Sequence, residues 1–181
     1  MNRTHVVSVA GVRRELPIVP VSSELSVAFL KLYGDPELIE QCASALARRV
    51  HQDVELLVGP ESGGILLTHL IGTKIGIPYV VARKKRRPNM VTPLHVSVQT
   101  IGTESIQHLF LDDDDARKVA GSRVAIVDEV VSSGGTLTAL RELLAQAAAQ
   151  VVQVLTVATE GEERDSVTSL CHLPVFRSEP T

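Results

Sequence analysis

The middle of the chain alternates between short apolar runs and longer stretches in which apolar residues recur at every third or fourth position. The short runs predict buried β-strands, and the longer stretches predict amphipathic helices. We expect strands at 54–58, 77–82, 124–127, 151–158 and 173–176, and helices at 36–51, 65–75 and 136–149. Strands that alternate with helices are typical of an α/β fold, in which helices flank a parallel central sheet and the crossovers are right-handed.

The regions around these elements are less regular. The segment 16–32 is rich in Val, Pro and Ser and predicts short extended pieces, after which Asp35, followed by a proline, is a suitable N-cap for the first helix. From 83 to 121 the periodicity weakens, which predicts an inserted segment with a hairpin around Gly102. Within it, the acidic run 112–115 indicates a turn in preference to a cation site.

The composition fits a single domain that spans residues 1–181. Apolar residues make up 44% of the chain and aromatic residues only 3%, so the core must consist of Val, Leu, Ile and Ala, which suits buried parallel strands. The net charge of −3 argues against a nucleic-acid partner. Cys42 and Cys171 show neither a disulfide framework nor metal-site spacing, and no apolar run approaches the ~18 residues of a membrane span. We therefore expect a cytoplasmic protein without a membrane partner.

One segment, 124–136, carries most of the functional information. Its apolar strand ends in Asp128 and Glu129, and a loop of Ser, Gly and Thr follows at the start of the next helix. Ligands of open α/β sheets bind beyond the carboxyl ends of the strands, and a helix N-terminus attracts phosphate through its unpaired N–H groups. The loop lacks the GxxxxGK[ST] and GxGxxG patterns of common nucleotide sites. A phosphate loop beside two carboxylates indicates a sugar phosphate; the alternative is a purely structural turn.

This segment resembles the phosphoribosyl-pyrophosphate motif of the type I phosphoribosyltransferases. The resemblance implies that Asp128 and Glu129 are the catalytic acids, which bind the ribose 2- and 3-hydroxyls and stabilise positive charge on the ribose. It also implies that the following loop binds the 5-phosphate. The loop residues are Ser132, Ser133, Gly134, Gly135 and Thr136.

A second match is closest to the adenine phosphoribosyltransferases of this family. The stretch 59–64, Gly-Pro-Glu-Ser-Gly-Gly, is similar to their pyrophosphate loop, and 77–85 is similar to the strand and basic exit that follow. The resemblance assigns Glu61, Ser62 and Gly63 to pyrophosphate binding. It implies a non-proline cis peptide bond, or another strained backbone, between Glu61 and Gly63.

The basic run that leaves the strand divides into two parts. Arg83 and Lys84 stand at the carboxyl end of the expected strand, where cations would meet a leaving pyrophosphate. Lys85, Arg86 and Arg87 fit a solvated loop equally well.

The chain departs from the adenine-specific pattern at two places. Gly63 stands where these enzymes usually have an arginine, so one cation toward pyrophosphate is lost. Their mobile loop carries Glu-Tyr before a glycine, whereas this chain has Thr100 and Ile101 before Gly102. Glu104 lies nearby and is an uncertain substitute.

The resemblance also implies how the rest of the chain is arranged. Residues 1–34 would form a small hood over the base site, and 86–109 would form a mobile loop that closes over the reaction. Phe29 or Tyr33 could stack on a base, although each fits a core position equally well.

Together these matches imply transfer of the 5-phosphoribosyl group from phosphoribosyl pyrophosphate to a nucleobase, a purine and adenine above all. Mg²⁺ would be the cofactor, held mainly by the substrate, with Asp128 as the one candidate protein ligand. The protein would be a homodimer. Two alternatives remain open: a transferase for hypoxanthine, guanine, xanthine or orotate, and a regulator of the same fold that senses phosphoribosyl pyrophosphate without turnover.

Overall fold

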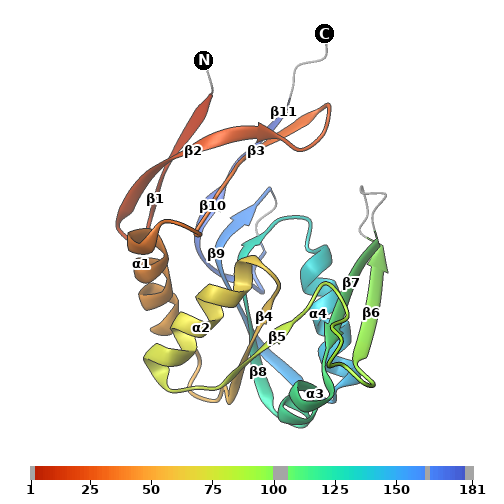
Figure 1. The fold of residues 1–181 in the computed structure, drawn as a ribbon. Helices are drawn as coiled ribbons and strands as arrows, with labels where there is room; N and C mark the ends of the chain where they lie inside the picture. Colours follow the sequence, from red (N-terminus) through yellow and green to blue (C-terminus); the bar gives the residue numbers. More distant parts are fainter. Residues whose placement is uncertain (1–2, 100–105, 162–163, 178–181) are drawn as a thin grey trace.

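The structure is a computed structural model that describes residues 3–99, 106–161 and 164–177 of the 181-residue chain. At its centre is a five-stranded sheet with the order β10-β9-β8-β4-β5, in which every neighbouring pair is parallel (Figure 1). Its strands are β4 (Leu56–Pro60), β5 (Tyr79–Ala82), β8 (Arg123–Val131), β9 (Gln150–Glu160) and β10 (Thr168–Leu173). The expected α/β fold with a parallel central sheet is confirmed.

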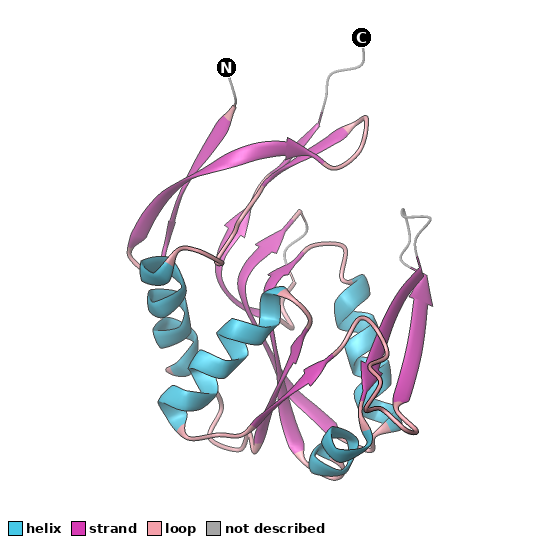
Figure 2. Ribbon diagram, in the orientation of Figure 1, coloured by secondary structure: helices cyan, strands magenta, loops and turns pink. Residues whose placement is uncertain are grey.

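Helices cover both faces of this sheet (Figure 2). The helices α1 (Pro36–Ala47) and α2 (Gly63–Ile75) lie on one face, and α4 (Gly135–Gln146) lies on the other with the short helix α3 (Asp113–Val119). Successive residues of β8 pack alternately into the two cores, because side chains along a strand point to opposite faces. Ala125 and Val127 join the core under α1 and α2, and Val124 and Ile126 join the core under α4.

The helix ends follow from local chemistry. The Asp35 carboxylate accepts a hydrogen bond from the Leu38 N–H at 3.0 Å, which confirms Asp35 as the N-cap of α1. The expected helix at 36–51 ends earlier, because Arg49 and Val50 donate to carbonyls three residues back and tighten the last turn. Among the described helices, none combines the length and the hydropathy needed to cross a membrane.

The expected hood is a separate antiparallel sheet. Its strands are β1 (Thr4–Val9), β2 (Val12–Pro20), β3 (Leu25–Ala28) and β11 (Val175–Arg177), in that order. Figure 1 shows this sheet beyond the carboxyl ends of the central strands, where β11 joins it from the far end of the sequence. The N-terminal segment alone therefore does not complete the hood.

The expected single strand at 173–176 is wrong. Residues on its two sides belong to different sheets: β10 ends at Leu173 in the central sheet, and β11 begins at Val175 in the hood. Pro174 separates them, because proline has no N–H for a sheet ladder and marks the point where the chain changes sheets.

The inserted segment contains a two-stranded hairpin, as expected. Strands β6 (Leu94–Gln99) and β7 (Ile106–Leu111) pair antiparallel, and the register places Leu94 opposite Leu111. Within the stretch 86–109, the described strands cover 94–99 and 106–109, and residues 86–93 form neither helix nor strand. Its tip, which carries Thr100, Ile101, Gly102 and Glu104, lies outside the described residues.

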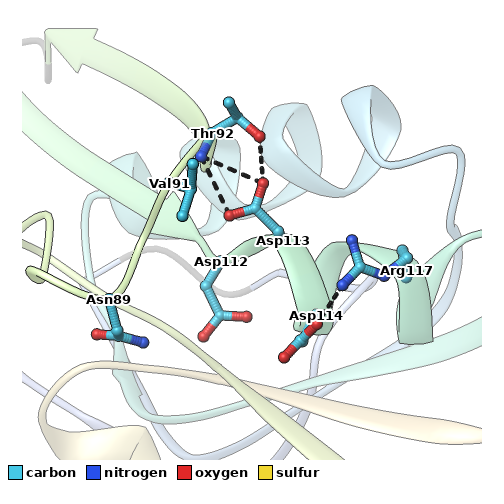
Figure 3. Close-up of a pocket in the computed structure, with 7 residues that line it drawn as sticks. All are labelled: Asn89, Val91, Thr92, Asp112, Asp113, Asp114 and Arg117. Atoms are coloured by element: carbon cyan, nitrogen blue, oxygen red, sulfur yellow. Dashed lines mark hydrogen bonds and ion pairs between the residues drawn. The ribbon is translucent and has the colours of Figure 1, made fainter.

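The acidic run 112–115 begins helix α3, so the expected turn is wrong. The Asp112 carboxylate accepts from the Asp115 N–H at 2.8 Å. Asp113 accepts from the Thr92 N–H at 3.1 Å (Figure 3). Asp114 pairs with Arg117 one turn later. Carboxylates are favourable in the first turn of a helix, because its dipole is positive there. The acids thus cap and fasten a short helix.

The hood is fastened to the central domain by an ion-pair cluster. Arg14 of β2 donates to both oxygens of Asp35 at 2.6 and 2.9 Å and to Glu37 at 2.7 Å. The guanidinium hydrogen bonds lower the pKa of Asp35 to about 2. The N-cap residue of α1 is therefore also the anchor of the hood.

Arg14→Gln should lower the midpoint of thermal unfolding at pH 7, whereas the exposed neighbour variant Arg13→Gln should not. Because the pKa of Asp35 is lowered on folding, the stabilisation is present above pH 4 and is lost as the pH falls toward 2. Calorimetry at pH 7 and pH 2.5 measures this. A deficit of equal size at both pH values would contradict the role of the ion pair.

Candidate functional site

The two acids predicted from the sequence lie near the carboxyl end of β8, the central strand. The Asp128 carboxylate accepts from the Glu129 N–H at 2.7 Å. Removal from water raises the pKa of Asp128 to about 7, and the negative charge of Glu129 adds to this. The hydrogen bond from the Glu129 N–H and the positive charge of Lys84 act in the opposite direction. The site therefore holds a carboxyl group whose ionisation depends on what binds beside it.

Glu129 connects this strand to the chain that leaves the hood. Its Oε1 accepts a hydrogen bond from the Leu32 N–H at 2.8 Å. Burial raises its pKa, and the Leu32 hydrogen bond limits the rise. On its other side, a Cβ built on Gly63 would lie 2.5 Å from Oε2 and 3.1 Å from the Glu129 Cβ. Glu129 thus fills the space that a side chain at position 63 would need. This contact explains why position 63 is a glycine.

The predicted pyrophosphate loop connects β4 to α2. The peptide bond between Glu61 and Ser62 is cis, as the sequence resemblance led us to expect. Ser62 is the N-cap of α2 and makes no side-chain capping hydrogen bond, and Gly63 is the first helical residue. The N-terminus of α2 therefore faces the same edge of the sheet as Asp128 and Glu129, the edge beyond the strand ends (Figure 1).

The Glu61 side chain turns toward the basic run. It accepts from the Lys84 N–H at 2.9 Å and from Arg87 at 2.8 Å, and Arg83 lies 3.7 Å away. Burial alone would raise the pKa of Glu61, but these partners hold the pKa below its ordinary value. Arg83 and Arg87 are therefore partly neutralised by Glu61, whereas the charge of Lys84 acts on Asp128.

The remaining basic residues of this run differ in their contacts. Arg86 donates to the carbonyls of Met90 and Val91 at 3.0 and 2.8 Å, so it shapes its own loop. Lys85 is exposed, and no hydrogen bond to it is present among the described residues. Arg86 and Arg87 thus make structural contacts within the protein, a role that the sequence alone did not decide.

Tyr33, in the short linker 32–35 between the hood and α1, contacts the predicted pyrophosphate loop. Its hydroxyl donates to the carbonyl oxygen of Ser62. Burial raises the pKa of Tyr33, and the negative charges of Glu129 and Asp128 raise it further. Tyr33 is 38% exposed and Phe29 is 50% exposed, so neither is a core residue. The core alternative for these two aromatic residues is wrong.

The predicted phosphate loop leads from β8 into α4. Gly134 has φ +85° and is the N-cap of α4, a conformation that favours glycine. The cap makes no side-chain hydrogen bond, which leaves the first N–H groups of the helix for an anion. Ser132 and Ser133 are exposed. The Thr136 hydroxyl donates to Gln107 of β7 at 3.0 Å, so the loop is in contact with the hairpin.

Sequence reasoning missed Arg164, which lies against this loop. Its Nη2 donates to the Ser132 carbonyl at 3.0 Å. The guanidinium also lies 3.3 Å from the position where a Cβ on Gly134 would be. Arg164 belongs to the connection between β9 and β10 and to no recognisable motif, so only the fold reveals it.

The described residues contain no cluster of three or more His, Cys, Asp or Glu side chains that could hold a metal ion on its own. Asp128 and Glu129 nevertheless supply the carboxylate oxygens that Mg²⁺ prefers. The donor set thus fits a magnesium ion that takes most of its ligands from a bound substrate and water.

Comparisons with known proteins agree with this geometry. The "Phosphoribosyl transferase domain" family matches residues 31–171. The chain is 35% identical over 128 residues to the hypoxanthine/guanine phosphoribosyltransferase of Methanothermobacter thermautotrophicus, covering 71% of this chain and 63% of that protein. It is 30% identical over 140 residues to the adenine phosphoribosyltransferase of Rhodospirillum rubrum, covering 77% and 79%. The chain thus spans slightly less than two thirds of the first relative's length.

The fold is similar to that of solved adenine phosphoribosyltransferases. The structure from Rhodothermus marinus superposes with a TM-score of 0.70 at 24% identity, over 87% of this chain and 93% of that one. The family match covers both predicted anion loops and the acidic pair, which lies between them in the sequence. On these grounds the chain belongs to the phosphoribosyl transferase domain family.

Proposed function

We propose that the protein transfers the 5-phosphoribosyl group of phosphoribosyl pyrophosphate to a nitrogen of a purine base and releases pyrophosphate. One observation carries the proposal: two helix N-termini suited to anions, those of α2 and α4, flank the half-buried acids of β8 at one edge of the sheet. The relatives named above act on adenine or on hypoxanthine and guanine, which supports a purine acceptor and leaves the choice among purines to experiment.

In the proposed reaction, the bond between ribose C1 and pyrophosphate breaks, a bond from the base nitrogen to C1 forms, and that nitrogen releases its proton to solvent. The N–H groups of residues 133–136 hold the 5-phosphate, and Asp128 and Glu129 accept hydrogen bonds from the ribose hydroxyls. Their negative charge stabilises positive charge on the ribose as pyrophosphate leaves. Most of the catalysis is therefore positioning and charge stabilisation.

Asp128 has to be ionised to act in this way. Its pKa of about 7 means that the free protein holds a mixture of charged and neutral forms near neutral pH. Ribose hydroxyls and the charge of Lys84 would favour the ionised form. Bound Mg²⁺ would neutralise the leaving pyrophosphate, with Asp128 as the candidate protein ligand.

The pyrophosphate side of the site relies on few cations. Glu129 occupies the space beside Gly63, and Glu61 engages Arg83 and Arg87. Lys84 is then the main cation of the basic run for pyrophosphate, helped by the N–H groups at the start of α2. The proposal also retains the homodimer and the cytoplasmic location expected from the sequence. Sedimentation of the purified protein tests the dimer, and a mass of 19.5 kDa, that of one chain, would contradict it.

The proposal is tested by incubating the protein with labelled phosphoribosyl pyrophosphate, Mg²⁺ and, one at a time, adenine, hypoxanthine, guanine, xanthine and orotate. We expect a purine nucleotide and pyrophosphate in equal amounts, and no product with orotate. Tight binding of phosphoribosyl pyrophosphate with no turnover of any base would instead identify a regulator. Absence of binding would contradict the site itself.

Asp128→Asn should stabilise the fold and impair the reaction. Folding raises the pKa of Asp128 from 3.8 to about 7, so as the pH rises the unfolded chain loses the Asp128 proton before the folded chain does. The free energy of unfolding therefore falls as the pH rises from about 4 to 7. At pH 8 the variant should gain about 2–4 kcal/mol in free energy of unfolding, and at pH 4 almost nothing. Turnover should fall about 10²–10³-fold.

Urea unfolding at both pH values and steady-state kinetics measure the two effects. Equal stability of variant and wild type at pH 8 would show that the carboxylate is well solvated. Unchanged turnover would rule out the ribose-binding role.

Lys84→Ala should lower kcat/KM about 30- to 1,000-fold, since a loss of about 2–4 kcal/mol in transition-state binding is expected for a main cation at the leaving group. The loss should appear mostly in kcat, because charge builds on pyrophosphate as the bond breaks. Lys85→Ala is the matched control and should behave like wild type. If both variants lose the same activity, Lys84 has no special place in the site.

A further inference from the structure

Arg164 brings a positive charge to the loop that we assign to the 5-phosphate. It lies in the connection between β9 and β10, whereas the loop follows β8, so the neighbouring positions of β8 and β9 in the sheet bring them together. One hydrogen bond, from Nη2 to the Ser132 carbonyl at 3.0 Å, holds the guanidinium beside the N-terminus of α4. This placement follows from the topology alone.

The Arg164 guanidinium has more donors than the described residues use. An arginine carries five N–H groups in a rigid plane, and one of them donates to Ser132. The Nε atom is buried and, within the described part of the chain, has no hydrogen-bond partner. A buried donor without a partner is costly, and a small shift of the guanidinium toward a bound phosphate would relieve that cost.

The loop geometry keeps the guanidinium close to the anion-binding N–H groups. A Cβ on Gly134 would stand 3.3 Å from Cζ, Nη1 and Nη2 of Arg164, so only glycine allows this approach without displacement. Gly134 is also the N-cap of α4, where the helix dipole is positive and no side chain caps the helix. The guanidinium and the positive end of the α4 dipole therefore lie close together, and an arginine is well suited to bind phosphate there with paired hydrogen bonds.

We propose that Arg164 is a direct ligand of the 5-phosphate of the substrate, in addition to the loop N–H groups. The inference rests on the proposed function, because it takes the α4 loop as the 5-phosphate site. It adds a cation to a site in which the family motif supplies only backbone and hydroxyl donors. It also differs from a purely structural role, in which Arg164 would only hold the Ser132 carbonyl.

The test measures the binding of two probes, ribose 5-phosphate and inorganic pyrophosphate with Mg²⁺, by calorimetry on the full chain. Arg164→Gln should weaken ribose 5-phosphate about 10- to 100-fold and leave pyrophosphate unchanged. Arg141→Gln removes an exposed arginine of α4 and should bind both probes like wild type. Because the second pKa of a phosphate monoester is near 6, the Arg164→Gln loss should be larger at pH 7.5 than at pH 5.

Several results would overturn the inference. Ribose 5-phosphate binding equal to wild type, a loss of the same size for both probes, or a loss independent of pH would each make Arg164 a structural residue only. Wild-type protein that binds neither probe would overturn the proposed function together with the inference. If Arg164→Gln does not fold, Arg164→Lys replaces it: this variant keeps the charge, and it must still bind ribose 5-phosphate several-fold more weakly with pyrophosphate unchanged.

Discussion

The structure depends on two neighbouring carboxylates held at the end of its central strand. Asp128 is kept from water strongly enough to raise its pKa to about 7, and Glu129 is held by the Leu32 N–H. Burying acids beside each other opposes folding, so a site of this kind persists where a ligand uses the charge. The surrounding features accommodate that charge. Gly63 leaves space for the Glu129 side chain, the positive charge of Lys84 acts on Asp128, and the N-termini of α2 and α4 lie on either side.

The hood is connected to this site through a short linker. Leu32 donates its N–H to Glu129, and the Tyr33 hydroxyl donates to Ser62 of the pyrophosphate loop. A few residues later, Asp35 caps α1 and binds Arg14 of the hood. The linker thus touches the acids, the pyrophosphate loop and the hood within four residues, 32–35.

Sequence reasoning predicted the parallel sheet and the positions of the two loops before α2 and α4 and of Asp128 and Glu129 near a strand end. Each of these depends on local pattern: apolar runs, glycines at helix starts and carboxylates at a strand end. It missed what depends on contacts between distant segments. Arg164 belongs to no motif, the partner of Gly63 is Glu129 across the site, and β11 joins a hood built from the other end of the chain. The acidic run 112–115 was misread as a turn because the N-cap role of Asp112 is visible only with the helix after it.

The central claim is that one edge of the sheet binds a phosphorylated ribose, with its phosphate at the N-terminus of α4 and its hydroxyls on Asp128 and Glu129. A crystal structure with phosphoribosyl pyrophosphate and Mg²⁺, without a base, tests this most directly. The account predicts the 5-phosphate within hydrogen-bond distance of the N–H groups of residues 133–136, and the ribose 2- and 3-hydroxyls on Asp128 and Glu129. Density for the ligand elsewhere, or a ribose ring turned away from both carboxylates, would contradict it.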